Sequence, residues 1–230
     1  IWDDDVDLRN EFKVLNAGGK VKISDKLEIE FIHMTHSTPQ TVMIALHSKY
    51  GTILYANDFK FDGSPVIGKK PDFDRLKELG QENVVALICD SLYSDKEGKT
   101  PSEKVAREML KDVMLGTESS DNLIIATTFA SHIARLKSII DFGKSLNRKI
   151  VFFGRSLDKY IRAAEKANII KFSDKVELIP RKNEIGKKLR EIEKQGRNKY
   201  LIVCTGNQGE GQAVLSKMAD GRIPFDFIPF

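Results

Sequence analysis

Apolar and polar residues alternate in three runs between residues 20 and 60, around 27–33, 41–47 and 52–57. A period of two is typical of β-strands that bury one face. Turn-forming segments such as Lys49, Tyr50 and Gly51 join the runs, and short connections pair successive strands antiparallel. The first part of the chain is therefore predicted to form an antiparallel sheet.

From about residue 83 the pattern changes to short, continuous apolar runs that alternate with stretches of helical period. Continuous apolar strands are typical of parallel sheets with both faces covered. The predicted strands are 83–89, 122–127, 149–153 and 200–204, and the predicted helices are 102–115, 131–146, 157–167 and 187–195. Ser102 after Pro101 favours a helix start, and Gly116 a helix end. The predicted fold class is α/β, with a mixed β region followed, from about residue 100, by a doubly wound parallel sheet.

Composition adds little to this picture. The chain has 230 residues, 41% of them hydrophobic, which is enough for a sizeable core, and its formal net charge of +4 does not by itself indicate a polyanionic partner. Cys89 and Cys204 each end an apolar run, which predicts buried, reduced thiols in an intracellular protein. No apolar stretch approaches the ~18 residues that span a bilayer and no signal peptide is recognised, so a cytoplasmic protein without a membrane partner is expected.

The first candidate site pairs a histidine with a carboxylate. His36 follows one predicted strand and Asp58 ends another two strands later, so an antiparallel meander can bring both to one edge of the sheet. Imidazole and carboxylate groups suit Zn²⁺. The alternative, a hydrogen-bonded surface pair, stays open at this stage. His33, His47 and His132 are interpreted as structural.

Three further candidates follow predicted strands. Asp90, in the segment CDS, stands where open α/β sheets place functional residues, and it would act as a proton acceptor or orient a metal-bound histidine. Its alternative role is a helix N-cap. The turns at 126–131 and 204–211 are rich in hydroxyl groups, amides or glycine, so their backbone N–H groups are candidates for binding phosphate. Ordinary strand-to-helix turns are the alternative for both.

A basic stretch covers residues 181–199, where eight lysines and arginines are interrupted by Glu184, Glu191 and Glu193. Such a stretch follows a nucleic-acid backbone or, alternatively, forms a solvated helix face. The acidic cluster at residues 3–7 is interpreted as a surface turn. No repeat or low-complexity tract is seen.

Six short segments occur in an order that resembles ribonuclease J, the metallo-β-lactamase nucleases with an inserted β-CASP domain. They are HSTPQ at 36–40, NDFKFD at 57–62, CDS at 89–91, TTFAS at 127–131, FFGRS at 152–156 and TGNQGE at 205–210. The resemblance runs from about residue 20 to the end of the chain. It implies a partial metallo-β-lactamase domain at 1–98, a β-CASP domain at 99–222, and at 223–230 the start of a return to the first domain.

The resemblance also implies an activity and its residues. His36 matches a metal ligand, Asp58 the carboxylate that bridges two zinc ions, and Asp90 the acidic first motif of the β-CASP signature. The implied reaction is hydrolysis of single-stranded RNA, mainly from the 5′ end and also internally, with two Zn²⁺ per active site and a homodimer in the full-length protein. The implied RNA- and phosphate-binding residues are Ser37, Ser91, Thr128, Ser131, Gly206, Asn207, Gln208 and Glu210.

The chain departs from the family pattern in missing motifs and in single positions, and each departure leads to an expectation. The HxHxDH segment and the later histidine motifs of the family are missing, so the chain is interpreted as a fragment with no fully bound zinc and no activity of its own. Gln40 replaces an acid, and Ala56 and Asn57 replace Thr and Gly, which indicates an archaeal or divergent branch. Two alternatives stay open: a related cleavage-factor-like endonuclease, and an RNA-binding scaffold that has lost its metal.

Overall fold

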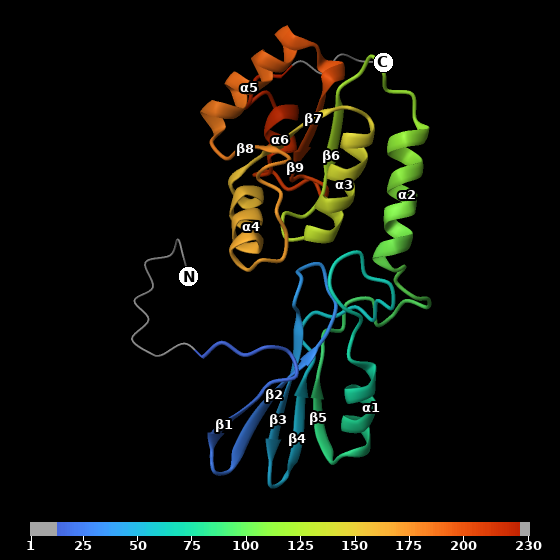
Figure 1. Ribbon diagram of the computed structural model, residues 1–230, viewed down its shortest axis with the longest axis vertical. Helices are drawn as coiled ribbons and strands as arrows, with labels where there is room; N and C mark the ends of the chain where they lie inside the picture. Colours follow the sequence, from blue (N-terminus) through green and yellow to red (C-terminus); the bar gives the residue numbers. More distant parts are fainter. Residues whose placement is uncertain (1–12, 226–230) are drawn as a thin grey trace. The chain divides into compact units, whose positions relative to one another are not determined.

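The computed structural model describes residues 13–225, and these form two compact units, each considered by itself (Figure 1). Unit 1 holds residues 13–35, Gln40–Phe61 and Lys70–Gly98, and unit 2 holds His36–Pro39, Asp62–Lys69 and residues 99–225. The acidic segment at residues 3–7, predicted to be a surface turn, and the end of the chain from residue 226 lie outside the described residues. No helix between residues 13 and 225 is long and apolar enough to cross a membrane.

Unit 1 is built on a five-stranded sheet whose strands follow the order of the chain. These strands are β1 (Lys20–Ser24), β2 (Leu27–His33), β3 (Val42–Ser48), β4 (Gly51–Tyr55) and β5 (Val84–Ile88). β2, β3 and β4 pair antiparallel, which confirms the prediction from alternation. β1, which was not predicted, also pairs antiparallel with β2, and β5 pairs with β4 in parallel. Helix α1 (Phe73–Gln81) lies between β4 and β5 in the chain, as a parallel pair requires a long crossover.

Within residues 13–225, only one face of this sheet packs into a buried cluster. Ile32, Met43 and Ala45 point to the side that α1 covers and form that cluster with Leu79 of α1. On the opposite face the register aligns apolar side chains in two rows across the strands. The rows are Val21, Ile29, Leu46, Ile53 and Ala86, and then Phe31, Ile44, Tyr55 and Ile88. None of these nine side chains belongs to a buried cluster of residues 13–225.

The prediction that the run at 83–89 is buried on both faces is wrong. Val85, Leu87 and Ile88 are each more than half exposed, because β5 is the edge strand of a sheet with one uncovered face. The thiol of Cys89, just beyond β5, is also exposed, whereas Cys204 is buried as predicted, and both cysteines are free. Burial raises the pKa of the Cys204 thiol to about 12, so this thiol is unreactive at neutral pH.

Because one face of the sheet is uncovered, substitutions at neighbouring residues of β3 are expected to differ in their effect on the free energy of unfolding. Replacing Ile44 by lysine in this chain is expected to change the free energy of unfolding by about 1 kcal/mol or less and to reduce binding of an apolar dye, because Ile44 lies on the uncovered face. Replacing Ala45 by lysine is expected to cost several kcal/mol, roughly 3 or more, because Ala45 is fully buried. Equal losses in urea unfolding for both variants would contradict this assignment of the two faces.

A buried carboxylate holds β2, β3 and α1 together. Glu30 is only 3% exposed and receives two hydrogen bonds from Arg75 of α1, at 2.7 and 2.9 Å. His47 Nε2 lies 2.8 Å from the same carboxylate and Lys20 Nζ lies 3.3 Å away. The hydrogen bonds from Arg75 are the main reason that the pKa of Glu30 falls to about 2. His47 is therefore part of a structural network, in line with its interpretation from the sequence.

Unit 2 contains a four-stranded sheet in which every neighbouring pair is parallel. Its strands are β6 (Ile124–Thr127), β7 (Lys149–Phe153), β8 (Glu177–Ile179) and β9 (Tyr200–Cys204), in the spatial order β6, β9, β7, β8. Its helices are α2 (Glu103–Gly116), α3 (Ile133–Ser145), α4 (Arg155–Lys166), α5 (Lys182–Gln195) and α6 (Val214–Ala219), with a short 3₁₀ turn, η1 (Arg197–Lys199), before β9.

Both faces of this sheet are covered, so the predicted doubly wound α/β fold is confirmed. Side chains that alternate along β7 and β9 enter two separate buried clusters. Phe152 and Val203 pack with α3 and α4, and Phe153 and Ile202 pack with α5 and α6. As predicted, α2 begins after Ser102, whose side chain accepts a hydrogen bond from the Val105 N–H, and ends at Gly116.

Candidate nucleic-acid interface

The carboxyl ends of the four parallel strands in unit 2 lie at one edge of the sheet, because the strands run in the same direction. The turns that leave this edge carry polar residues after every strand: Thr128 after β6, Arg155 and Ser156 after β7, Arg181 after β8 and Thr205 after β9. Open α/β sheets bind ligands at such an edge. The sequence therefore places four turns where a ligand would be expected.

Two long helices begin at this edge, and the N–H groups of their first turns receive no hydrogen bond acceptor from the side chain of the N-cap residue. Gly154 is the N-cap of α4 and has φ +118°, a conformation that favours glycine, and Arg181 is the N-cap of α5. Neither cap residue makes a side-chain hydrogen bond to its helix. The first turn of each helix carries partial positive charge, which favours anions.

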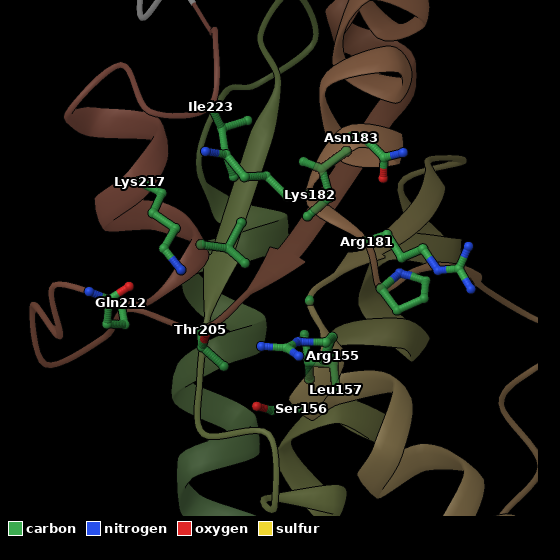
Figure 2. A pocket seen from close by; sticks show the side chains of 14 residues that line it. Arg155, Ser156, Leu157, Arg181, Lys182, Asn183, Thr205, Gln212, Lys217 and Ile223 are labelled. Carbon is green, nitrogen blue, oxygen red and sulfur yellow. The ribbon is translucent and has the colours of Figure 1, made fainter.

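A cavity of about 550 Å³, here called the basic pocket, opens between these helix starts and α6. Four basic side chains line it, namely Arg155, Arg181, Lys182 and Lys217, and no Asp or Glu is among its lining residues. Figure 2 shows Arg155 and Lys217 directed into the hollow from α4 and α6, whereas the Arg181 guanidinium group points away. Ser156, Thr205 and Gln212 supply neutral polar groups at its mouth. This arrangement suits a phosphate group or another anion.

A second cavity of about 380 Å³ adjoins the basic pocket and shares Ser156, Thr205 and Gln212 with it. It brings together Ser131, Asn207 and Glu210, three of the predicted RNA-binding residues, although they come from turns after different strands. Two aromatic side chains line the same cavity, Phe129 and Tyr160, which are 43% and 42% exposed. Exposed aromatic rings beside a basic pocket are typical of single-stranded nucleic-acid sites.

The other predicted residues of these turns have local structural roles. Thr128 is buried and its N–H donates to the Cys204 carbonyl at 3.3 Å. The Gln208 N–H donates to Glu210 at 3.2 Å. Gly206 has φ +130°, and an added Cβ would approach the Leu215 Cβ to 2.8 Å, so this turn requires glycine.

The segments that carry His36 and Asp58 are joined within unit 1 by an isolated bridge. The Lys60 N–H donates to the Thr35 carbonyl at 2.8 Å, and the Thr35 hydroxyl donates to the Lys60 carbonyl. His36 directly follows Thr35 but belongs to unit 2, whereas Asp58 precedes Lys60 by two residues and belongs to unit 1. Both side chains are exposed, and His36 Nδ1 lies 3.2 Å from the Ser37 hydroxyl. The role of this pair as metal ligands stays a prediction.

Two further carboxylates, one in each unit, accept hydrogen bonds from backbone N–H groups. Asp62, at the end of the NDFKFD segment, is 3% exposed and accepts hydrogen bonds from Ser64 N–H at 2.8 Å and Glu103 N–H at 2.7 Å. It thereby anchors the first turn of α2. Asp90 is exposed and accepts a bond from Leu92 N–H at 2.7 Å, which stabilises a turn and not the helix N-cap considered above. Ser91 is exposed beside it.

Within residues 13–225 no group of three or more His, Cys, Asp or Glu side chains is arranged to hold a metal ion. A tetrahedral zinc site needs at least three protein ligands. The described residues therefore do not by themselves form such a site, although His36 and Asp58 have suitable donor atoms.

The residues of the basic pocket were not predicted as a group from the sequence. Arg155 and Ser156 belong to a segment that carries the family resemblance, and their place after an apolar strand was an available signal. Lys217 gave no such signal, because the six-residue helix α6 that presents it was not predicted. Only the sheet topology brings these positions together.

Comparison with known proteins agrees with the fold. Residues 121–224 match the family model described as "Ribonuclease J, beta-CASP domain". Together with its doubly wound parallel sheet, this match makes that part of unit 2 a β-CASP domain. Similarity to ribonuclease J extends over the rest of the chain as well, as the following relatives show, and residues 121–224 belong to the family that this model describes.

Three relatives illustrate this similarity. The protein named Ribonuclease J from Methanocaldococcus jannaschii is 41% identical over 96% of this chain, and that from Pyrococcus abyssi is 41% identical over 94%. Ribonuclease J of Helicobacter pylori strain J99 is 33% identical over 92% of the chain. The chain spans 49%, 48% and 29% of the lengths of these three proteins.

One solved structure shares the fold. It is a protein of unknown function from Enterococcus faecalis V583, with a TM-score of 0.50 and 13% sequence identity. The similarity covers 88% of this chain and 47% of that protein.

Proposed function

We propose that the full-length protein is a cytoplasmic, metal-dependent ribonuclease that hydrolyses single-stranded RNA, mainly from the 5′ end and also internally. The observation that carries this proposal is the 41% identity to a protein named Ribonuclease J across nearly the whole chain. The basic pocket and the adjoining aromatic cavity support it, because they combine cations, hydroxyl groups and stacking surfaces at one edge of the β-CASP sheet.

In this proposal most of the residues that bind and orient RNA belong to unit 2. Arg155 and Lys217 attract the phosphates, while Ser131 and Asn207 offer hydrogen bonds and Phe129 stacks on a base. Ser37, Ser91, Thr128, Gly206, Gln208 and Glu210 are proposed to line the same RNA path. Asp90 is proposed to assist as a proton acceptor or by orienting a ligand.

His36 and Asp58 are proposed to be two ligands of a zinc centre whose remaining ligands come from the rest of the full-length protein. When bound, zinc would lower the pKa of a water molecule and stabilise the negative charge that develops on the phosphate. With only two of these ligands, the 230-residue chain alone is predicted to be inactive. We also propose a homodimer for the full-length protein.

The experiment that tests the metal requirement uses the full-length protein and a single-stranded RNA. Treatment with a chelator is expected to remove more than about nine tenths of the activity, and added Zn²⁺ is expected to restore it. The reason is that the proposed nucleophile is a water molecule activated by the metal, which the chelator removes. Release of labelled nucleotides over time measures the effect. Undiminished cleavage after exhaustive chelation would rule out the metal-dependent part of the proposal.

A further inference from the structure

A third cavity continues the basic pocket along helix α5. It has a volume of about 490 Å³ and is lined by Lys182, Asn183, Gly186, Arg190, Ile223 and Pro224. Because Lys182, Asn183 and Ile223 also line the basic pocket, the two cavities adjoin each other. We call the two cavities together the α5 groove.

The α5 sequence explains why the groove is open. Lys182, Gly186 and Arg190 are spaced four residues apart, so they lie on the same side of the helix. Gly186 in the middle has no side chain to fill the space, and an added Cβ would meet only the Arg190 Nη1, at 3.9 Å. A glycine costs helix stability, and here it leaves a passage between two cations.

The groove carries positive charge that the acidic residues of α5 do not neutralise. Those residues pair elsewhere: Glu184 with Arg181, Glu191 with Lys188, and Glu193 with Arg197. Among residues 13–225 no carboxylate forms an ion pair with Arg155, Lys182, Arg190 or Lys217, and no Asp or Glu lines either cavity. A ligand with several negative charges is therefore expected.

We propose that the α5 groove binds the sugar-phosphate backbone of a single-stranded RNA over at least two nucleotides, with Arg155, Lys217, Lys182 and Arg190 as successive phosphate contacts. Four basic side chains spread over two adjoining cavities favour a chain of phosphates over one isolated phosphate. Ile223 and Pro224 give the groove an apolar wall suited to sugars or bases. The choice of RNA among polyanions rests on the proposed function. The evidence for an anion-binding groove comes from residues of unit 2 and does not depend on that function.

The test measures binding of a fluorescent, hydrolysis-resistant 2′-O-methyl RNA to the full-length protein, with poly-glutamate as a competing polyanion. The triple variant Lys182→Gln, Arg190→Gln, Lys217→Gln is expected to bind about tenfold or more weakly, and the slope of log affinity against log salt is expected to flatten by about 2, because single strands contribute about 0.7 per phosphate contact. The matched control is Lys187→Gln, Lys194→Gln, Lys199→Gln, which removes the same charge from exposed positions outside the groove. It is expected to bind within about twofold of the natural protein.

A single substitution separates loss of binding from misfolding. Gly186→Glu places a carboxylate inside the groove, where an added Cβ meets only the Arg190 Nη1 at 3.9 Å, and it is expected to weaken binding about as much as the triple variant. Its thermal midpoint is expected not to fall, because glutamate favours a helix more than glycine does.

Equal losses of RNA affinity in the triple variant and its control, or full RNA binding by Gly186→Glu, would overturn the proposal that the α5 groove binds RNA. Competition by poly-glutamate as strong as by RNA would overturn the choice of RNA. Because no cleavage is measured, these results are independent of whether the protein hydrolyses RNA.

Discussion

Replacing Asp58 by asparagine in the full-length protein is expected to lower the rate of RNA hydrolysis by about a hundredfold or more. Changing a residue that merely supports a metal ligand often lowers metal affinity or activity 10- to 100-fold. Changing a carboxylate that contacts the metal directly is expected to lower the activity at least as much. Asparagine keeps the size of the side chain but removes its charge. Initial rates with labelled RNA measure the loss, and bound zinc measured in the same samples is expected to fall.

The matched control is Asp25→Asn, which removes one exposed carboxylate from the turn between β1 and β2. It is expected to leave the rate within about twofold, since surface substitutions away from a site have small effects. RNA binding by the Asp58 variant is expected to persist, because all the proposed RNA contacts except Ser91 lie in unit 2. Near-normal hydrolysis by Asp58→Asn would contradict the assignment of Asp58 as a ligand of the metal centre.

Removing the guanidinium group of Arg75 is expected to destabilise the protein by about 3–5 kcal/mol. Arg75→Ala leaves Glu30 as a buried carboxylate without its bidentate partner, and breaking a buried ion pair on one side is costly. Denaturation of this chain in urea measures the effect. Glu78 offers a matched control, because it pairs with the same arginine but its side chain is 66% exposed. Glu78→Gln is expected to cost about 1 kcal/mol or less.

The same network predicts how stability depends on pH. The folded state lowers the pKa of Glu30 from 4.5 to about 2. A lowered pKa stabilises the fold above the unfolded value and loses that contribution as the pH falls through the folded value. The stability difference between the natural chain and Glu30→Gln is therefore expected to be full above about pH 5 and to shrink between pH 4.5 and 2. A difference that stays constant over this range would contradict the role of Glu30.

Much of the fold could be predicted from residue patterns. The strands β2 to β4 lie where alternating runs were predicted, and β6, β7 and β9 are continuous apolar runs. Their ends agree with the prediction to within two residues, and their pairing types agree as well. The pattern failed where an element is short or polar. The missed elements are the five-residue β1, the three-residue β8, the six-residue α6 and the nine-residue α1. Helix α5 begins at Lys182, five residues before the predicted start at 187.

These failures have physical reasons. The first turn of α5 is Lys182, Asn183 and Glu184, which offers no apolar position until Ile185. The prediction that β5 is buried on both faces failed because periodicity describes the residue types of a strand and not its place in a sheet. An edge strand and a central strand can share the same apolar sequence.

The candidate site was predictable only in part. The turns with Ser131 and Asn207 were recognisable as positions after apolar strands, and they do meet at one cavity. The α5 groove was not recognisable, because it depends on a glycine in a helix and on a lysine from α6. Such a site arises from the packing of α5 beside α6, which no local pattern encodes.

The most direct test of the central claim is incubation of the full-length protein with a single-stranded RNA that carries a 5′-monophosphate and a label on its first nucleotide. We predict early release of the label as a mononucleotide, with slower release from the matching 5′-triphosphate RNA. RNA that stays intact in the presence of added Zn²⁺ would contradict the assignment of a ribonuclease.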